Sequence, residues 1–200
     1  MAKVLLPYIS IDLETTGLDL ERSQILQIAA VYDDGKSPIA ELPRFNVFIN
    51  EPITYAELGA LVLHAKSGLF SRIQEANKKG ESKKLSQGID DFLKFLDDHR
   101  NPREGGGKYK VNLAGKNAGT YDIPILKNWM NYAQGLYFKD LIYCSIIDAG
   151  SIYFRDFGRI PSLGEILKHI QAAKTEVTHD AMEDALDVVI AIRHRFGILH

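Results

Sequence analysis

The feature that most constrains the fold is an apolar segment, residues 4–11, that ends in two acidic residues. An apolar run of this kind is typical of a central strand that is buried on both faces. Asp12 and Glu14 lie two residues apart in YISIDLETTGLD, so their side chains point to the same face of a strand. Neighbouring carboxylates repel unless a cation lies between them, and Mg²⁺ takes such oxygen ligands. A pair this short also occurs on solvated strand ends, so its meaning depends on the rest of the chain.

The remaining pattern predicts an α/β protein whose mixed central β-sheet is flanked by α-helices. We expect strands at 4–14, 24–33, 43–50 and 109–115. We expect helices at 55–65, 68–77, 84–98, 122–134, 162–170 and 180–196, and an extended or helical run at 141–154. We find no internal repeat, and residues 1–200 are expected to form a single domain.

Two further motifs place polar side chains next to predicted elements. Asp122 follows the apolar strand within LAGKNAGTYDIPIL, and Asn117 precedes it by five residues. His179 stands five residues before Asp184 in THDAMEDALDVV, at the start of the final amphipathic helix. These residues are candidates for a shared site. We expect the other acids of that segment, Asp180, Glu183 and Asp187, to be solvated, and Asp148 to cap a helix or to hydrogen-bond within the fold.

Composition limits the partners that the chain can bind. Apolar residues make up 46% and charged residues 25%, as in ordinary globular proteins. Lys and Arg number 24 against 26 Asp and Glu, a net charge of −2, which argues against strong non-specific binding of duplex nucleic acid. Acids that hold metal would be neutralised and could attract phosphate through the metal. A short or single-stranded substrate fits this balance better.

The remaining composition points to a cytoplasmic protein with no membrane partner. The apolar run at the start is too short for a signal peptide, and no stretch reaches transmembrane length. The single cysteine, Cys144, lies in the apolar run LIYCSII, so we expect a buried, inert thiol.

The three motifs, in this order, resemble the DEDDh family of 3′–5′ exonucleases, which have a ribonuclease H-like fold. The resemblance implies hydrolysis with two divalent metal ions, Mg²⁺ or Mn²⁺, and release of nucleoside 5′-monophosphates. The implied metal ligands are Asp12, Glu14, Asp122 and Asp184. His179 would be the general base that takes a proton from the attacking water. The implied contacts to the substrate's terminal nucleotide come from Thr15, Gly17 and Leu18.

Within that family the chain resembles the oligoribonuclease branch. This resemblance rests on the segments IDLETTGLDLERSQILQIA, HAKSGL with Arg72, and HDAMED. The resemblance places His64 near the substrate and makes a homodimer plausible. Gly59 and Ser145 stand where that branch has a Trp that packs on a base and an Arg that caps a 5′ phosphate. GKNAGTYD, with Asn117, is as similar to the proofreading exonucleases, so specialisation for dinucleotides is not expected.

Three functions remain open at this stage. The leading one is a 3′–5′ exonuclease that acts on the 3′ ends of single-stranded DNA or RNA. The second is an oligoribonuclease that degrades short RNA oligomers. The third is a catalytically idle nucleic-acid-binding module, which the presence of all four acids and of His179 disfavours.

Overall fold

The computed structural model describes residues 6–101, 106–172 and 179–198, and these form a five-stranded mixed sheet in the order β3-β2-β1-β4-β5. The strands are β1 (Tyr8–Thr15), β2 (Ile25–Asp33), β3 (Arg44–Phe48), β4 (Val111–Gly115) and β5 (Ile142–Asp148). Strands β1, β2 and β3 are antiparallel neighbours, whereas β4 and β5 run parallel to β1. The apolar segment at the start of the chain therefore becomes the central strand, as predicted. Residues 4 and 5 of that predicted strand lie outside the described residues.

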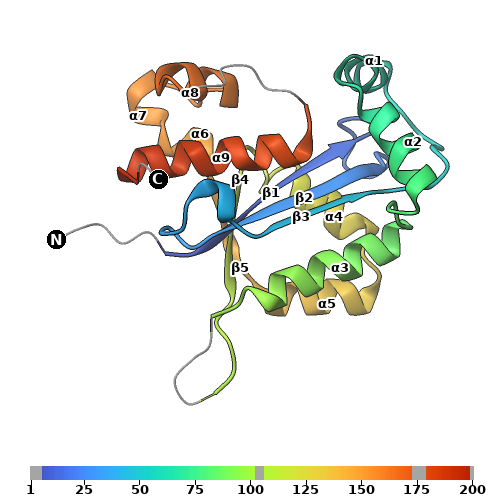
Figure 1. The fold of residues 1–200 in the computed structure, drawn as a ribbon, viewed down its shortest axis with the longest axis horizontal. Helices are drawn as coiled ribbons and strands as arrows, with labels where there is room; N and C mark the ends of the chain where they lie inside the picture. Colours follow the sequence, from blue (N-terminus) through green and yellow to red (C-terminus); the bar gives the residue numbers. More distant parts are fainter. Residues whose placement is uncertain (1–5, 102–105, 173–178, 199–200) are drawn as a thin grey trace.

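Helices cover both faces of this sheet (Figure 1). One layer consists of α3 (Leu85–Asp98), α4 (Asp122–Trp129) and α5 (Tyr132–Leu141). The opposite layer consists of α6 (Ala149–Ile152), α7 (Phe154–Phe157), α8 (Leu163–His169) and the long α9 (Ala181–Phe196). Helices α1 (Leu58–Ser67) and α2 (Leu69–Lys79) stand together at the end of the sheet toward which β1 runs. The predicted sandwich of a mixed sheet between helices is confirmed.

The alternation of side chains along β1 divides the core into two apolar clusters. Ile9, Ile11 and Leu13 point to the α3 and α5 layer, where they join the larger cluster. The alternate positions of β1, which are Tyr8, Ser10, Asp12 and Glu14, face α9. This second face is polar along much of its length, and it is the face on which the candidate site lies.

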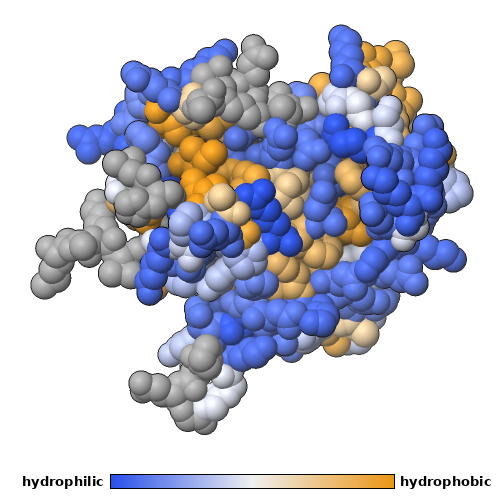
Figure 2. All heavy atoms as spheres, viewed as in Figure 1, coloured by the Kyte–Doolittle hydropathy of each residue, from blue (hydrophilic) through white to orange (hydrophobic). Residues whose placement is uncertain are grey.

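Among the described residues, none of the helices combines the length and the apolarity that crossing a bilayer requires. Figure 2 shows a largely hydrophilic face, with hydrophobic atoms around α9, over part of the sheet and over α1 at one end of the molecule. Leu58 and Val62 of α1 are 77% and 45% exposed.

Two predictions about local structure near the parallel strands were wrong. The expected helix over 122–134 is two helices, because Asn131 forms a capping box with Gln134 and so begins α5 anew. Cys144 is exposed rather than buried, because β5 is an edge strand whose middle residues face solvent. The ambiguous run over 141–154 is strand β5 followed by short helices.

The acids around Asp184 are also less solvated than expected. Glu183 is exposed, as predicted, but Asp187 is only 3% exposed. Asp180 is half-buried and caps the start of α9. The reason is that α9 lies across the sheet and also packs against α6 and α8, so its buried stripe is wider than one face. Asp148 caps α6, as predicted.

Candidate metal centre and adjoining pocket

Three carboxylates converge where β1 ends under the start of α9. Asp12 and Glu14 come from alternate positions of β1, and Asp184 comes from the first turn of α9. One ligand oxygen from each lies within 4.8 Å of the others. Glu14 and Asp184 are 6% and 7% exposed, and Asp12 is half-buried. Carboxylate oxygens in this arrangement are the ligands that hard divalent cations prefer.

The start of α9 is fixed by contacts that set the position of Asp184. The Asp180 side chain accepts hydrogen bonds from the backbone N–H groups of Met182 and Glu183, at 3.0 and 3.2 Å. The amide oxygen of Gln27 accepts from the Ala181 N–H at 3.4 Å, which ties the helix to β2. Asp184 therefore points at the sheet from a helix end that is anchored on both sides.

The electrostatics of this group favour a bound cation. Burial, and then the charges of Asp122, Asp184 and Glu14, hold the pKa of Asp12 well above its usual range. Burial and the charge of Asp184 raise the pKa of Glu14 to about 8, although the Arg72 guanidinium acts in the opposite direction. Because these carboxylates are destabilised as anions, a divalent cation would bind to them and restore their ionised form.

Asp122 lies beside this group but outside its three members. It begins α4, is 4% exposed, and accepts a hydrogen bond from the Leu13 backbone N–H at 2.9 Å. Burial raises its pKa to about 7, while the Leu13 N–H lowers it. Its charge acts on Asp12 more strongly than that of any other acid. Asp122 is thus placed to act on the site electrostatically.

His179 occupies the residue just before the Asp180 cap and is half-buried. Its backbone is left-handed, with φ of 54°, a conformation that non-glycine residues seldom adopt. Its charge contributes to lowering the pKa of His64, after the larger effect of burial, so the two imidazoles are close enough to interact. Arg72 pairs with Asp180 at 3.0 Å and so ties α2 to the segment that carries His179.

A cavity of about 300 Å³ adjoins the carboxylate group and shares Glu14 with it. Its apolar lining comes from Leu13, Leu18, Gly59, Ala60 and Leu63, and its polar lining includes Glu57 and Tyr121. Thr15, Gly17, Leu18 and His64, four of the residues expected to contact substrate, all line it. Nothing lies within 4 Å of where a Gly59 Cβ would be, so this wall of the cavity is open.

Hydrogen bonds within the cavity wall already engage several of these groups. The Thr15 hydroxyl donates to the Gly17 carbonyl oxygen at 2.8 Å, and the Tyr121 hydroxyl donates to the same oxygen. His64 Nε2 donates to the Thr15 carbonyl oxygen at 2.7 Å, so this nitrogen carries a proton. His64 Nδ1 lies 3.6 Å from a Glu14 carboxylate oxygen. His64, which is 2% exposed, therefore joins α1 to the end of β1.

Glu57, the residue before α1, is a lining residue that sequence reasoning missed. Its Oε1 accepts from the backbone N–H groups of Leu18 and Asp19, at 3.0 and 3.1 Å. A Cβ on Gly17 would lie 2.7 Å from two Glu57 side-chain carbons. The Glu57 side chain thus fills the space that the missing Cβ of Gly17 leaves. The glycine in the sequence indicates that some group comes close to it. The sequence does not reveal that this group is Glu57, because Glu57 lies 40 positions further on.

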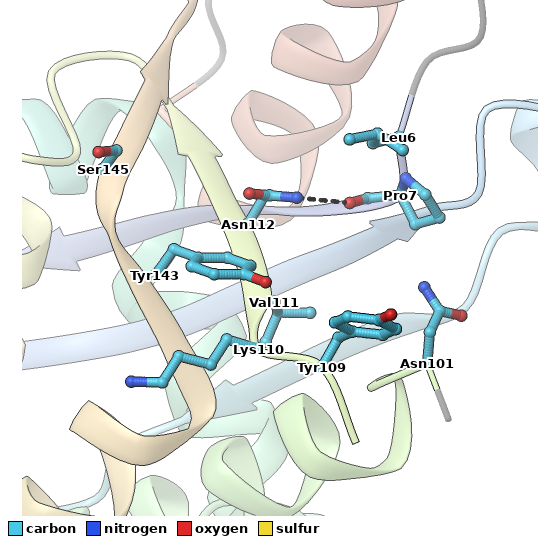
Figure 3. A pocket seen from close by; sticks show the side chains of 9 residues that line it. All are labelled: Leu6, Pro7, Asn101, Tyr109, Lys110, Val111, Asn112, Tyr143 and Ser145. Atoms are coloured by element: carbon cyan, nitrogen blue, oxygen red, sulfur yellow. Dashed lines mark hydrogen bonds between the residues drawn. The ribbon is translucent and has the colours of Figure 1, made fainter. Parts of the chain in front are cut away.

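Asn117 and Ser145 lie away from this cavity. Asn117 has φ of 60°, and its backbone N–H donates to Asp148 at 2.7 Å in a separate cavity. Ser145 borders a third cavity, of about 600 Å³, where the rings of Tyr109 and Tyr143 point inward (Figure 3). Because Tyr8 pairs with Asn112 there, this cavity lies at the opposite end of β1 from the carboxylates.

Comparisons with known proteins support the fold and not a closer kinship. No family model and no curated protein sequence matches the chain significantly. Pop2p of S. pombe, in a form with Mg²⁺ and Mn²⁺ bound, superposes with a TM-score of 0.68 and 16% identity, covering 94% of this chain and 82% of that one. E. coli exonuclease I in complex with single-stranded DNA, a zinc-bound form, gives 0.65 and 15%, over 94% of this chain and 40% of that one.

Cell-death related nuclease 4 gives a TM-score of 0.62 at 15% identity, over 96% of this chain and 64% of its own. The chain thus spans most of the length of Pop2p but less than half of exonuclease I. At identities this low, the likeness concerns the path of the backbone. The chain has the ribonuclease H-like fold of these solved structures, as predicted from the sequence.

Proposed function

We propose that this chain is a DEDDh-type, metal-dependent 3′–5′ exonuclease that hydrolyses single-stranded nucleic acid. The observation that carries the proposal is the group of three carboxylates, Asp12, Glu14 and Asp184, beside a cavity of nucleoside size. The group supplies ligands for cations, and the cavity can take the last nucleoside of a chain. A phosphodiester that joins the last two nucleotides would then lie over the carboxylates.

Two divalent ions, Mg²⁺ or Mn²⁺, fit the chemistry of these donors. Asp12, Glu14 and Asp184 would hold them, and Asp122 would support the same shell directly or through water. When bound, such ions activate the attacking water and stabilise the leaving 3′ oxygen. Burial and neighbouring acids raise the pKa of Asp12 and of Glu14, and this supports the proposal because functional carboxylates often have shifted pKa values.

The chain's own residues have distinct roles in this proposal. His179 accepts the proton of the attacking water, for which its position just before the Asp180 cap suits it. Leu18, whose side chain is 72% exposed, contacts the terminal base from the rim of the cavity. Thr15, Gly17 and His64 shape the wall behind the sugar. Asn117 lines another cavity and would act on the substrate beyond its last nucleotide.

The substrate in this proposal is a single-stranded 3′ end, DNA or RNA. Solved complexes of exonuclease I with single-stranded oligonucleotides support the choice, because that protein shares the fold. The net charge of −2 also favours a substrate held by metal and by one cavity over a long duplex. We further propose that residues 1–200 act as one domain, that the protein is cytoplasmic, and that it can form a homodimer.

A cleavage assay tests the proposal. Single-stranded 20-mers of DNA and RNA with a 5′ label are incubated with wild-type protein and with Asp12→Ala, in Mg²⁺, Mn²⁺ or EDTA. We expect a ladder that shortens from the 3′ end, lost in EDTA and reduced at least about a thousandfold by the substitution. Glu75→Gln, which removes an exposed acid far along α2, serves as control and should leave the ladder unchanged. Intact substrate under every condition would leave a binding module.

A further inference from the structure

The Glu57 carboxylate is held in place before any substrate arrives. Its Oε1 accepts the Leu18 and Asp19 backbone N–H groups, and the Tyr55 hydroxyl donates to the same oxygen at 3.3 Å. The Arg22 guanidinium lies 4.5 Å from the centre of the Tyr55 ring. A carboxylate anchored by one oxygen loses little side-chain entropy when its other oxygen binds a ligand, which is the condition for selective recognition.

Glu57 is not used to cap its own helix. It occupies the residue before α1, yet its side chain makes no capping hydrogen bond there. The carboxylate instead reaches back across Gly17. A Cβ at position 17 would lie 2.7 Å from the Glu57 side chain, so only glycine permits this approach. The helix end is held in another way, because the Glu57 backbone N–H donates to the Thr16 carbonyl oxygen at 2.8 Å. The carboxylate is therefore available to face the cavity that it lines.

Glu57 is also an acceptor in the cavity with capacity left for a ligand. The hydroxyl protons of Thr15 and Tyr121 both go to the Gly17 carbonyl oxygen, and Glu14 belongs to the carboxylate group. Among the described residues, the hydrogen bonds found for the Glu57 side chain all use Oε1, which leaves Oε2 for a donor. An acceptor at this place calls for a hydroxyl group on the ligand.

From these contacts we propose that Glu57 selects a terminal ribonucleoside, so that the site prefers RNA 3′ ends to DNA 3′ ends. The inference rests on the proposed function, since that function puts the terminal sugar in this cavity. Ribose offers two neighbouring hydroxyls that can donate to one carboxylate, whereas deoxyribose offers one. A hydrogen bond to a charged acceptor in a partly buried site is worth about tenfold or more in affinity.

The test measures binding and cleavage with the same oligomers. Two 5′-fluorescein pentamers of RNA differ only in the terminal sugar, ribose or 2′-deoxyribose, and two DNA pentamers differ in the same way. Binding is followed by fluorescence anisotropy in Ca²⁺, with a gel to show that the oligomers stay intact, and cleavage is followed in Mn²⁺. The variants are Glu57→Gln, which keeps an oxygen for the Leu18 and Asp19 N–H groups, and Glu57→Ala, which does not.

Glu21→Gln is the matched control, because it removes an exposed charge from the same loop and does not line the cavity. Wild type and Glu21→Gln should bind the ribose-terminated member of each pair about tenfold more tightly or better. Glu57→Gln should bring this ratio close to one, and Glu57→Ala should in addition weaken binding of every oligomer. Equal binding of both sugars by wild type, a ratio that survives Glu57→Gln, or failure to bind any of the four would overturn the inference. Sugar-selective binding without cleavage would uphold it and reject hydrolysis.

Discussion

Two groups of buried charges lie on the same face of the sheet, one under each end of α9, and they differ in composition. At the far end, Asp33 is 0% exposed and meets Arg193, which is 1% exposed. Arg193 Nη2 lies 2.6 Å from Asp33, its Nε also donates to that carboxylate, and the Tyr8 hydroxyl donates at 2.8 Å. Here every negative charge has a cation and hydrogen bonds from the protein.

At the near end, Asp12, Glu14 and Asp184 meet with Asp122 beside them. The Arg72 guanidinium lowers the pKa of Glu14, but it is one-third exposed and pairs with Asp180. The result is a raised pKa for Asp12 and Glu14. The two ends of α9 thus hold different kinds of buried group. One joins an acid to a cation, and the other consists mainly of acids, which is the composition that hard divalent cations prefer.

The largest effect should follow from breaking the paired group. Arg193→Met leaves Asp33 buried without its cation, and we expect a loss of about 3–5 kcal/mol in the free energy of unfolding, measured by urea denaturation. Arg195→Met is the matched control on the same helix. Its ion pair with Asp156 is about one-third exposed, so its loss should cost only about 0–1 kcal/mol. Equal losses for the two variants would show that burial does not distinguish the pairs.

The carboxylate group should make metal-free stability fall with rising pH. The pKa of Glu14 is raised from 4.5 to about 8 on folding, so the folded chain keeps a proton that the unfolded chain releases between these values. Stability from this group is full below the lower value and is lost as pH rises through the upper one. Urea unfolding in EDTA across this range should show the decline, and Glu14→Gln should show less of it. A decline of the same size in Glu14→Gln would assign it to other groups.

Removing one charge from the carboxylate group should stabilise the metal-free protein, which is opposite in sign to the effect at Arg193. Asp12→Asn keeps the size of the side chain and removes the anion that burial and four neighbouring acids disfavour. We expect a gain of roughly 1–2 kcal/mol in EDTA above pH 8. Thermal unfolding with and without EDTA measures it. A destabilised variant in EDTA would mean that the Asp12 anion is satisfied within the chain.

The smallest effect concerns Arg72. Arg72→Met removes a cation that lowers the pKa of Glu14 and that pairs with the partly exposed Asp180. We expect a loss of about 1 kcal/mol or less in metal-free stability, since part of the pair faces solvent. Urea unfolding in EDTA measures it, and a loss as large as that of Arg193→Met would contradict the distinction between the two groups.

Sequence patterns were sufficient where the deciding interactions are local. The spacing of Asp12 and Glu14 along a strand predicted that they share a face, and the structure brings them together. The helix expected from residue 162 does begin there, because the Ser162 side chain caps the helix that follows it. The association of Asp184 with the pair across more than 160 residues came from the order of motifs and not from any local pattern.

Interactions between residues far apart in the sequence could not be predicted from sequence patterns. Asp33 and Arg193 are 160 positions apart, and each alone looks like a charge at the end of an element. Glu57 reads as an ordinary residue before a helix, because its partners Leu18 and Asp19 lie 39 and 38 positions back. Cys144 was misplaced because an apolar strand looks the same at the edge of a sheet as at its centre. Position within the sheet is a tertiary property.

Metal binding tests the central difference between the two groups most directly. The unfolding temperature of wild type, Asp12→Asn and Arg195→Met is measured as Mn²⁺ is added to metal-free protein. Binding to the folded state at a hundredfold excess over Kd contributes about 2.7 kcal/mol, so wild type and Arg195→Met should show a saturable rise of several degrees. Asp12→Asn should lose most of that rise. The same rise in all three proteins, or no rise in wild type, would contradict the account.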